Sequence, residues 1–158
     1  MQRGFTLSLP SGWERSAERL TPYLEAPRER FAAGTFPLQH RKGACSHMPT
    51  GALSTMRPAD GFVTVQERSG VGRPTRSGYP RRPARFAARA KARPGDLTTG
   101  CLPARRNDLV EFWLPFSDAG RAFYALVVLG RDASRRTRAE AFAILDRIRF
   151  DPVVRPSG

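Results

Sequence analysis

Residues 110–150 read VEFWLPFSDAGRAFYALVVLGRDASRRTRAEAFAILDRIRF, and this stretch decides the fold. Apolar residues occupy every second position from Val110 to Phe116, which predicts a strand with one apolar face. Residues 117–120 predict a turn, because Ser and Asp side chains bond their own backbone and Gly tolerates positive φ. Residues 122–129 predict a second strand with two apolar faces. The stretch therefore predicts a β-hairpin whose second strand is central and covered on both sides.

A helix is predicted directly after this hairpin. Asp132 or Ser134 can accept hydrogen bonds from backbone N–H groups at its start. Apolar residues recur at helical spacing across residues 135–149, with charged residues on the opposite side. Pro115 has no backbone N–H to donate, so it should lie near the end or on the free edge of the first strand. Because one helix cannot cover both faces of the second strand, the rest of the chain has to supply another layer.

The N-terminal part of the chain predicts the remaining strands and short helices. Strands are predicted at residues 5–9, 31–38 and 62–67, short helices at 20–24 and 50–56, and a turn at 57–61. Trp13 is expected to pack in the core or against a turn. This order of elements predicts an α+β fold, a mostly antiparallel sheet with helices packed on it. With 158 residues the chain suits one domain, which we place at residues 1–152, before a flexible tail at 153–158.

The chain is strongly basic, with a formal net charge of +13 and a pI of about 11.4. Such charge is typical of proteins that bind nucleic acid, anionic membrane surfaces or acidic partners. However, the basic residues are 25 Arg and only 2 Lys, in a chain rich in Ala, Gly and Pro. GC-rich coding produces this skew without selection for charge, so a solvated Arg-rich surface is the simpler interpretation. The sequence contains no run of about 18 apolar residues, so no transmembrane segment is predicted. No apolar signal-peptide core follows Met1.

Residues 69–106 differ in composition from the rest of the chain. They hold ten basic residues, five prolines and one acidic residue, Asp96. Such a segment predicts a functional or partly disordered loop, in which residues 84–92 could form a short basic helix. The candidate anion-binding residues are Arg73, Arg76, Arg81, Arg82, Arg85 and Arg89. Tyr79 and Phe86 could stack on bases of a nucleic acid, although two aromatic residues in this length are close to chance.

The two cysteines and two histidines allow several interpretations. Cys45 and Cys101 could form one disulfide or remain reduced thiols, and their number alone does not decide between these. His40 and His47 could join them in a zinc site, but the spacing is not one of the usual ones. Cys45 as a nucleophile with His47 as its base lacks a nearby oxyanion hole or orienting carboxylate. We therefore assign no catalytic residue, metal ligand or cofactor from the sequence.

Seven short motifs spread over nearly the whole chain carry a family resemblance. They are residues 5–13, FTLSLPSGW; 20–24, LTPYL; 35–38, TFPL; 45–47, CSH; 65–67, VQE; 114–123, LPFSDAGRAF; and 143–152, AILDRIRFDP. In these motifs the chain resembles a group of uncharacterised actinobacterial domains, often the extracytoplasmic part of membrane-anchored proteins. Its layout is more distantly similar to the Mog1/PsbP-type sandwich. The resemblance implies a structural Cys45–Cys101 disulfide outside the cytoplasm, and it carries over no activity.

The sequence favours a non-enzymatic interaction or sensor domain outside the cytoplasm, with the loop at 69–106 as its contact surface. Its partner would be an unidentified protein or small molecule. The alternative is a basic module that binds nucleic acid or an anionic surface. An enzyme ranks third, and it would need a pocket that brings His47 together with a carboxylate.

Overall fold

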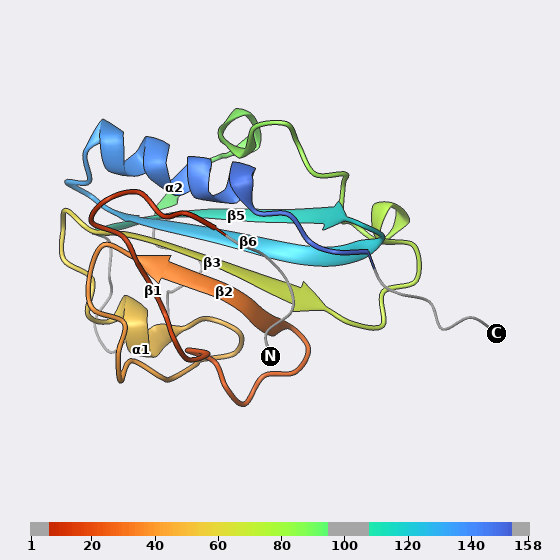
Figure 1. Ribbon diagram of the computed structural model, residues 1–158, viewed down its shortest axis with the longest axis horizontal. Helices are drawn as coiled ribbons and strands as arrows, with labels where there is room; N and C mark the ends of the chain where they lie inside the picture. The colour runs from red at the N-terminus through yellow and green to blue at the C-terminus, as the bar shows by residue number, and fades with distance from the viewer. Residues whose placement is uncertain (1–6, 95–107, 153–158) are drawn as a thin grey trace.

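A six-stranded sheet forms the centre of the computed structural model, which describes residues 7–94 and 108–152 (Figure 1). The strand order is β1-β2-β3-β6-β5-β4, and every neighbouring pair is antiparallel. The strands are β1 (Glu14–Arg15), β2 (Arg28–Gly34), β3 (Gly61–Arg68), β4 (Arg93–Pro94), β5 (Leu109–Asp118) and β6 (Arg121–Gly130). The helices are α1 (Thr50–Leu53) and α2 (Arg135–Arg147), and two 3₁₀-helices are η1 (Pro74–Arg76) and η2 (Phe86–Arg89). The predicted α+β class is confirmed.

The C-terminal hairpin forms where the sequence predicts it. Strands β5 and β6 pair without a break from Leu109↔Gly130 to Asp118↔Arg121. The predicted turn is shorter than four residues, because Ala119 and Gly120 alone make it, with φ of 51° and 75°. Two successive positive φ values define the type I′ turn, whose twist matches that of paired strands. Strand β6 lies between β3 and β5 and is central, as predicted.

The edge of β5 and the start of α2 also follow the prediction. Strand β4 pairs only with Val110 and Glu111, so Pro115 lies farther along the outer edge of β5, where no β4 residue needs its missing N–H. The side chain of Ser134 caps α2 by accepting a 3.0 Å hydrogen bond from the backbone N–H of Thr137. The predicted short helix at 50–56 is realised as α1, and the strand at 62–67 as β3.

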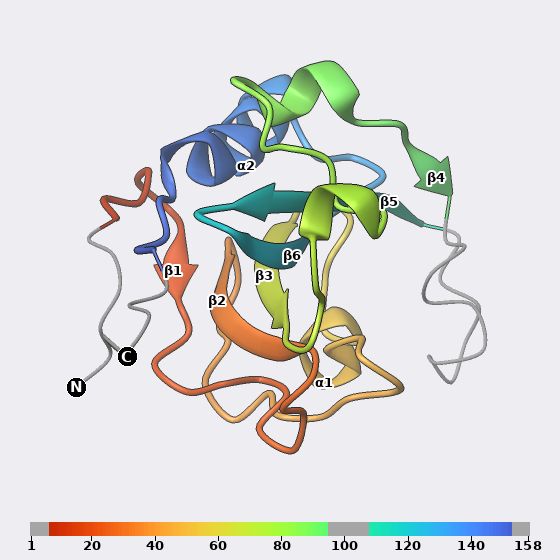
Figure 2. The ribbon, with the colours of Figure 1, turned by 90° about the vertical axis from the view of Figure 1, so that its right-hand side faces the viewer.

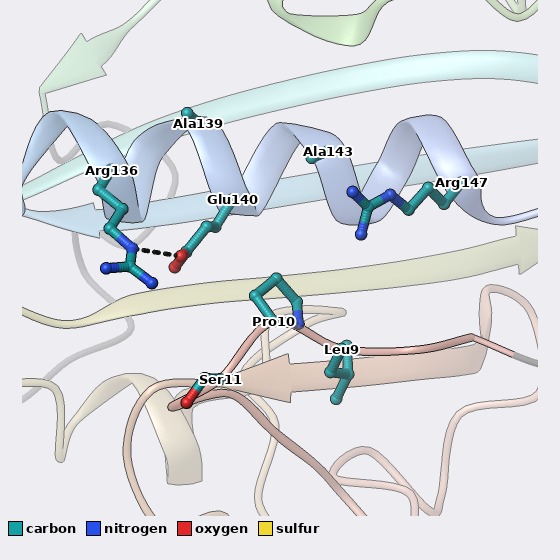
Figure 3. A pocket seen from close by; sticks show the side chains of 8 residues that line it. All are labelled: Leu9, Pro10, Ser11, Arg136, Ala139, Glu140, Ala143 and Arg147. Atoms are coloured by element: carbon teal, nitrogen blue, oxygen red, sulfur yellow. Dashed lines mark hydrogen bonds and ion pairs between the residues drawn. The ribbon is translucent and has the colours of Figure 1, made fainter.

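The predicted first strand at 5–9 is wrong for the residues described. Residues 7–9 belong to no strand, and the first strand is instead Glu14–Arg15. Leu7 and Leu9 are partly buried against the core on the α2 side, and Figure 3 shows Leu9 and its neighbours beside that helix. The apolar alternation therefore serves side-chain packing and not backbone pairing. Trp13 is buried as predicted, and its indole N–H donates a 2.9 Å hydrogen bond to Glu140 of α2.

Residues 20–38 depart from the prediction in two places. No helix forms at 20–24, where the backbone makes a turn closed by the N–H of Leu24 and the carbonyl of Thr21. The buried carboxylate of Glu29 fixes this turn, because both of its oxygens accept hydrogen bonds from the N–H of Leu20 at 3.1 and 2.9 Å. The strand predicted at 31–38 runs from Arg28 to Gly34 instead.

A charge network joins β2, β3 and β6. Glu67 accepts hydrogen bonds from Arg121 at 2.8 and 2.6 Å and from Arg30 at 2.6 Å. Burial acts to raise the pKa of Glu67, but the two guanidinium groups outweigh it and lower the pKa below its ordinary value. Glu67 is therefore a paired carboxylate within the sheet, and its single negative charge is shared between the two arginines.

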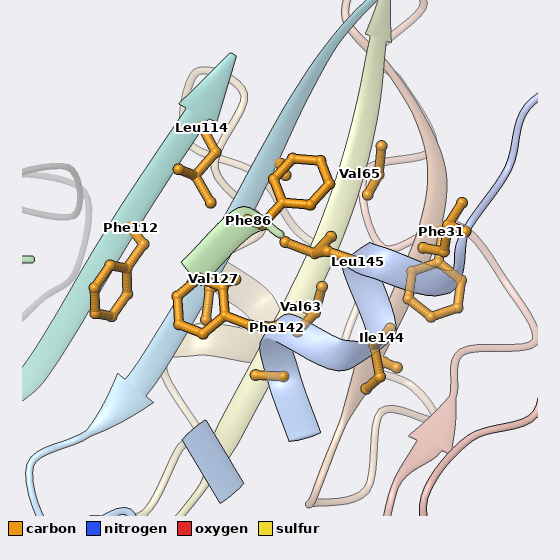
Figure 4. Close-up of a cluster of buried hydrophobic side chains, with 14 of the residues drawn as sticks. Phe31, Val63, Val65, Phe86, Phe112, Leu114, Val127, Phe142, Ile144 and Leu145 are labelled. Carbon is orange, nitrogen blue, oxygen red and sulfur yellow. The ribbon is translucent and has the colours of Figure 1, made fainter. Parts of the chain in front are cut away.

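Two hydrophobic clusters cover the two faces of the sheet. On one face, the side chains of α2 pack on β3, β5 and β6, and Figure 4 shows Phe142 and Leu145 of α2 pointing toward Val63 and Val127. On the other face, α1 and the segments around it pack on Leu126 and Val128. Figure 2 shows the sheet between these two layers. The second layer that β6 requires is thus supplied by the N-terminal part of the chain.

Some predictions fall on residues outside the described parts. These are residues 95–106 of the basic loop, Cys101, and the tail at 153–158. Across residues 7–94 and 108–152, no helix has the length and apolar character needed to cross a bilayer.

Candidate functional site

The basic segment is ordered by backbone contacts over the described residues 69–94. The N–H of Ser117 donates a 2.7 Å hydrogen bond to the carbonyl of Pro80, and the N–H of Arg82 donates a 2.9 Å bond to the carbonyl of Ser117. The segment includes η1 and η2 and ends in β4, which pairs with β5. Figure 2 shows it running along the outer side of β5 and past α2. The helix predicted at 84–92 is only the four-residue η2.

Both aromatic residues of this segment are buried. Phe86 is 1% exposed, its ring packs edge-on against Phe116 at 5.0 Å, and its N–H donates to Asp146. Tyr79 is 6% exposed, and its hydroxyl lies 2.5 Å from that of Tyr124. Burial and the neighbouring Tyr124 raise the pKa of Tyr79 to about 12. The possibility that these rings stack on bases is therefore not supported, because both rings are covered by the fold.

Arg82 also belongs to the scaffold. Its side chain is 12% exposed and forms a 3.1 Å ion pair with Asp118. The same guanidinium donates to the carbonyl of Leu145 and lies over the rings of Phe86 and Phe116, at 5.3 and 5.9 Å from their centroids. Burial lowers its pKa, and Arg149 acts in the same direction. Of the six arginines predicted to bind anions, this one links the basic segment to the hairpin and to α2.

The other predicted arginines are exposed. Arg89 donates a 2.8 Å hydrogen bond to the carbonyl of Arg81. The guanidinium groups of the remaining four make no hydrogen bond or ion pair with any other residue that the structure describes. We call these four residues the basic surface: Arg73, Arg76, Arg81 and Arg85. They carry positive charge that no described carboxylate neutralises.

Basic residues are more often paired in residues 14–68 than in residues 69–94. Residues 14–68 contain eight basic and six acidic residues, whereas residues 69–94 contain eight basic residues and no acidic one. At least five of the eight in the first group form ion pairs, namely Arg19, Arg28, Arg30, Lys42 and Arg57. Among the described side chains of residues 69–94, only Arg82 does. Coding bias accounts for many arginines, but residues 69–94 differ from residues 14–68 in that their eight basic residues have no acidic residue within the same segment.

A groove lies between the basic segment and the β5–β6 turn. Its volume is about 660 Å³. One wall is formed by residues 72–75 and the other by residues 117–120, and Arg81 and Arg82 also line it. The sequence shows no sign of this pairing, because nothing local relates the hairpin turn to a segment about 45 residues earlier. The groove brings together Arg73, Arg81 and Arg82 and separates them from the other predicted arginines.

Two further cavities hold no comparable set of unpaired groups. One, of about 470 Å³, lies between residues 9–11 and α2 (Figure 3). Its only carboxylate, Glu140, is bonded to Arg136 and Trp13, which lower its pKa. The other, of about 340 Å³, lies beside residues 14–18 and includes His40 and the ion pair of Lys42 with Glu18.

His47 packs against aromatic rings. Its ring lies 5.1 Å from that of Trp113 and 6.2 Å from that of Tyr124, centroid to centroid. Burial lowers its pKa, and the nearby Arg68 adds to this effect. None of the three cavities above is lined by His47, so they do not supply the pocket that an enzyme based on this residue would need.

The described residues contain no cluster of three or more His, Cys, Asp or Glu side chains suited to a metal ion. His40 lines the cavity beside residues 14–18, whereas His47 packs against Trp113 and Tyr124. Because Cys101 lies outside the described residues, the Cys45–Cys101 disulfide stays a prediction.

The chain matches no protein-family model, no curated protein and no solved structure.

Proposed function

We propose that this protein is a non-enzymatic interaction domain that binds an anionic partner through the basic surface. One observation carries the proposal: the four guanidinium groups are exposed and lack a described ion-pair partner, in a segment with eight basic residues and no acidic one. Guanidinium groups bind carboxylates and phosphates through two parallel hydrogen bonds, so unpaired ones are suited to such partners.

The attachment of the segment to the sheet supports the same proposal. Its backbone is bonded to β5 through Pro80, Arg82 and β4, and Phe86 anchors it in the core. Arginines on an anchored segment lose less conformational freedom on binding than arginines on a mobile loop. Like charges gathered on one segment also build a positive potential that attracts an anionic partner before contact.

Nucleic acid is the less supported partner. Binding of single strands relies on exposed aromatic rings, and those of Tyr79 and Phe86 are buried. Contact with the phosphates of a duplex needs only positive charge and remains the alternative.

Substitution of the basic surface tests the proposal. In the test variant, four residues are changed to Gln: Arg73, Arg76, Arg81 and Arg85. We expect this variant to bind a poly-glutamate peptide about tenfold or more weakly, since each lost contact with a charged partner is worth several tenths of a kcal/mol. The readout is the dissociation constant at low and moderate salt. A duplex DNA of mixed sequence, measured in parallel, identifies the alternative if it binds more than tenfold tighter than the peptide.

The matched control changes net charge equally at other exposed arginines. These are Arg41, Arg131, Arg135 and Arg147, all changed to Gln; they are exposed, and none forms a side-chain ion pair with a described residue. We expect an effect below threefold. Equal weakening by the two quadruple variants would show that only net charge matters, and it would refute the proposal.

We also propose, from the resemblance, that Cys45 and Cys101 form a disulfide and that the domain acts outside the cytoplasm. Cys45 lies in a polar connection, and its backbone bridges to that of Met48. Cys101 follows Cys45 by 56 residues, and a disulfide between them would stabilise the fold by about 4 kcal/mol in the chain-entropy account. Intact mass after thiol blocking, with and without reductant, should show both cysteines protected until reduction. Immediate reaction of both would refute the disulfide.

A further inference from the structure

The groove beside the hairpin turn has walls held by hydrogen bonds. On one side, the carbonyl of Arg73 accepts hydrogen bonds from the N–H of Arg76 at 3.0 Å and from the hydroxyl of Ser77 at 3.1 Å. On the other side, the two-residue turn connects the paired strands β5 and β6, and Ser117 is hydrogen-bonded to the basic segment through both its N–H and its carbonyl. The groove is therefore set by backbone structure, and a ligand would not have to organise it.

The charges around the groove are unequal. Asp118 is the only acidic residue that lines it, and this carboxylate is paired with Arg82. Arg73 and Arg81 line it as well, and neither guanidinium bonds to another described residue. The groove therefore presents two unneutralised positive charges, together with Thr75, whose hydroxyl can act as a donor.

We propose that this groove binds a phosphomonoester group. A phosphomonoester carries a charge of about −1.5 to −2 at pH 7 and three acceptor oxygens, which match two guanidinium groups and a hydroxyl. A single carboxylate would leave one of the two arginines unneutralised. The volume of about 660 Å³ lies within the range of sites for small ligands and single side chains, roughly 300–1,000 Å³.

This proposal rests on the proposed function and narrows it to one chemical group. The same group occurs on a phosphorylated side chain of a protein and on a free small molecule. A neutral peptide with one phosphoserine, the same peptide unphosphorylated or with Asp in that place, and phenyl phosphate distinguish these sources. Tight binding of the peptide with weak binding of phenyl phosphate would assign a protein partner, and equal binding would assign a small molecule.

The test compares arginines of one segment. We expect Arg73→Gln and Arg81→Gln each to weaken binding of the phosphoserine peptide about tenfold. Arg76→Gln and Arg85→Gln are matched controls. Both residues are exposed and unpaired, as Arg73 and Arg81 are, but they do not line the groove, so each change should alter the affinity for the phosphoserine peptide less than twofold. Binding should also weaken from pH 7.5 to pH 5.5, because the second ionisation of the phosphate has a pKa of about 6 and protonation removes one negative charge. The Asp peptide should show no such pH dependence.

The outcomes separate this site from the proposed function. If all four single variants weaken the phosphoserine peptide equally, or if it binds no better than the unphosphorylated peptide, the groove proposal is overturned. The contrast between the two quadruple variants with poly-glutamate would then still decide the proposed function. If that contrast is absent while the groove variants behave as expected, the general anion-binding role of the basic surface is refuted and only a discrete phosphate site remains.

Discussion

Gly130→Ala should lower the free energy of unfolding by about 3 kcal/mol or more. A Cβ atom at residue 130 would lie 2.2 Å from the carbonyl oxygen of Pro58, 2.5 Å from its carbonyl carbon and 2.7 Å from the carbonyl oxygen of Arg57. These are backbone atoms, so no side-chain rotation relieves the overlap. The substitution therefore forces apart β6 and the turn at residues 57–60.

That turn resists displacement because several hydrogen bonds hold it. Asp60 accepts from the N–H of Arg57 at 2.8 Å through its carboxylate and from the N–H of Gly130 at 2.8 Å through its carbonyl. The carbonyl of Pro58 accepts from the N–H of Asp132 at 2.8 Å. Moving the turn away from a methyl group would break at least some of these bonds, each worth about 1 kcal/mol.

Chemical denaturation of the Gly130→Ala variant, with Gly72→Ala as the control, measures this loss of unfolding free energy. A Cβ on Gly72 would meet no atom within 4 Å, so this control should stay within about 0.5 kcal/mol of the natural protein. A loss below about 1 kcal/mol for Gly130→Ala would contradict the close packing of β6 on the turn.

The hairpin and α2 could be predicted because their signals are local. Alternation in β5, the Ala119-Gly120 turn and the Ser134 cap each act within a few residues, and all agree. The first strand could not be predicted in the same way. The alternation at residues 5–9 indicates an apolar face, but a strand also needs the edge of another strand to pair with. Glu14 and Arg15 pair with the edge of β2 instead.

The candidate site was only partly predictable, for a related reason. The sequence presents six similar arginines in one segment, and only long-range contacts distinguish them. Asp118 and Leu145, 36 and 63 residues from Arg82, bind that arginine and leave its neighbour Arg81 exposed. Tyr79 and Phe86 also have partners far away in the sequence, namely Tyr124 and Asp146, 45 and 60 residues later. Two aromatic residues that look available for stacking in the sequence are therefore buried in the fold.

Arg82→Ala should lower the free energy of unfolding by about 2–3 kcal/mol, the second large effect we expect. It leaves the partly buried carboxylate of Asp118 and the carbonyl of Leu145 without this donor, and it removes the guanidinium that covers Phe86 and Phe116. Arg81→Ala, one residue away, removes the same charge from an exposed position and should cost less than about 0.5 kcal/mol.

A double-mutant cycle isolates the ion pair from the packing at Arg82. Asp118→Asn keeps the shape of the side chain, so combining it with Arg82→Ala should cost about 1 kcal/mol less than the sum of the two single changes. Denaturation midpoints of the four proteins supply the comparison. Equal costs for Arg82→Ala and Arg81→Ala would mean that both arginines belong to the surface, and would contradict the pairing of Arg82 with Asp118 in the groove.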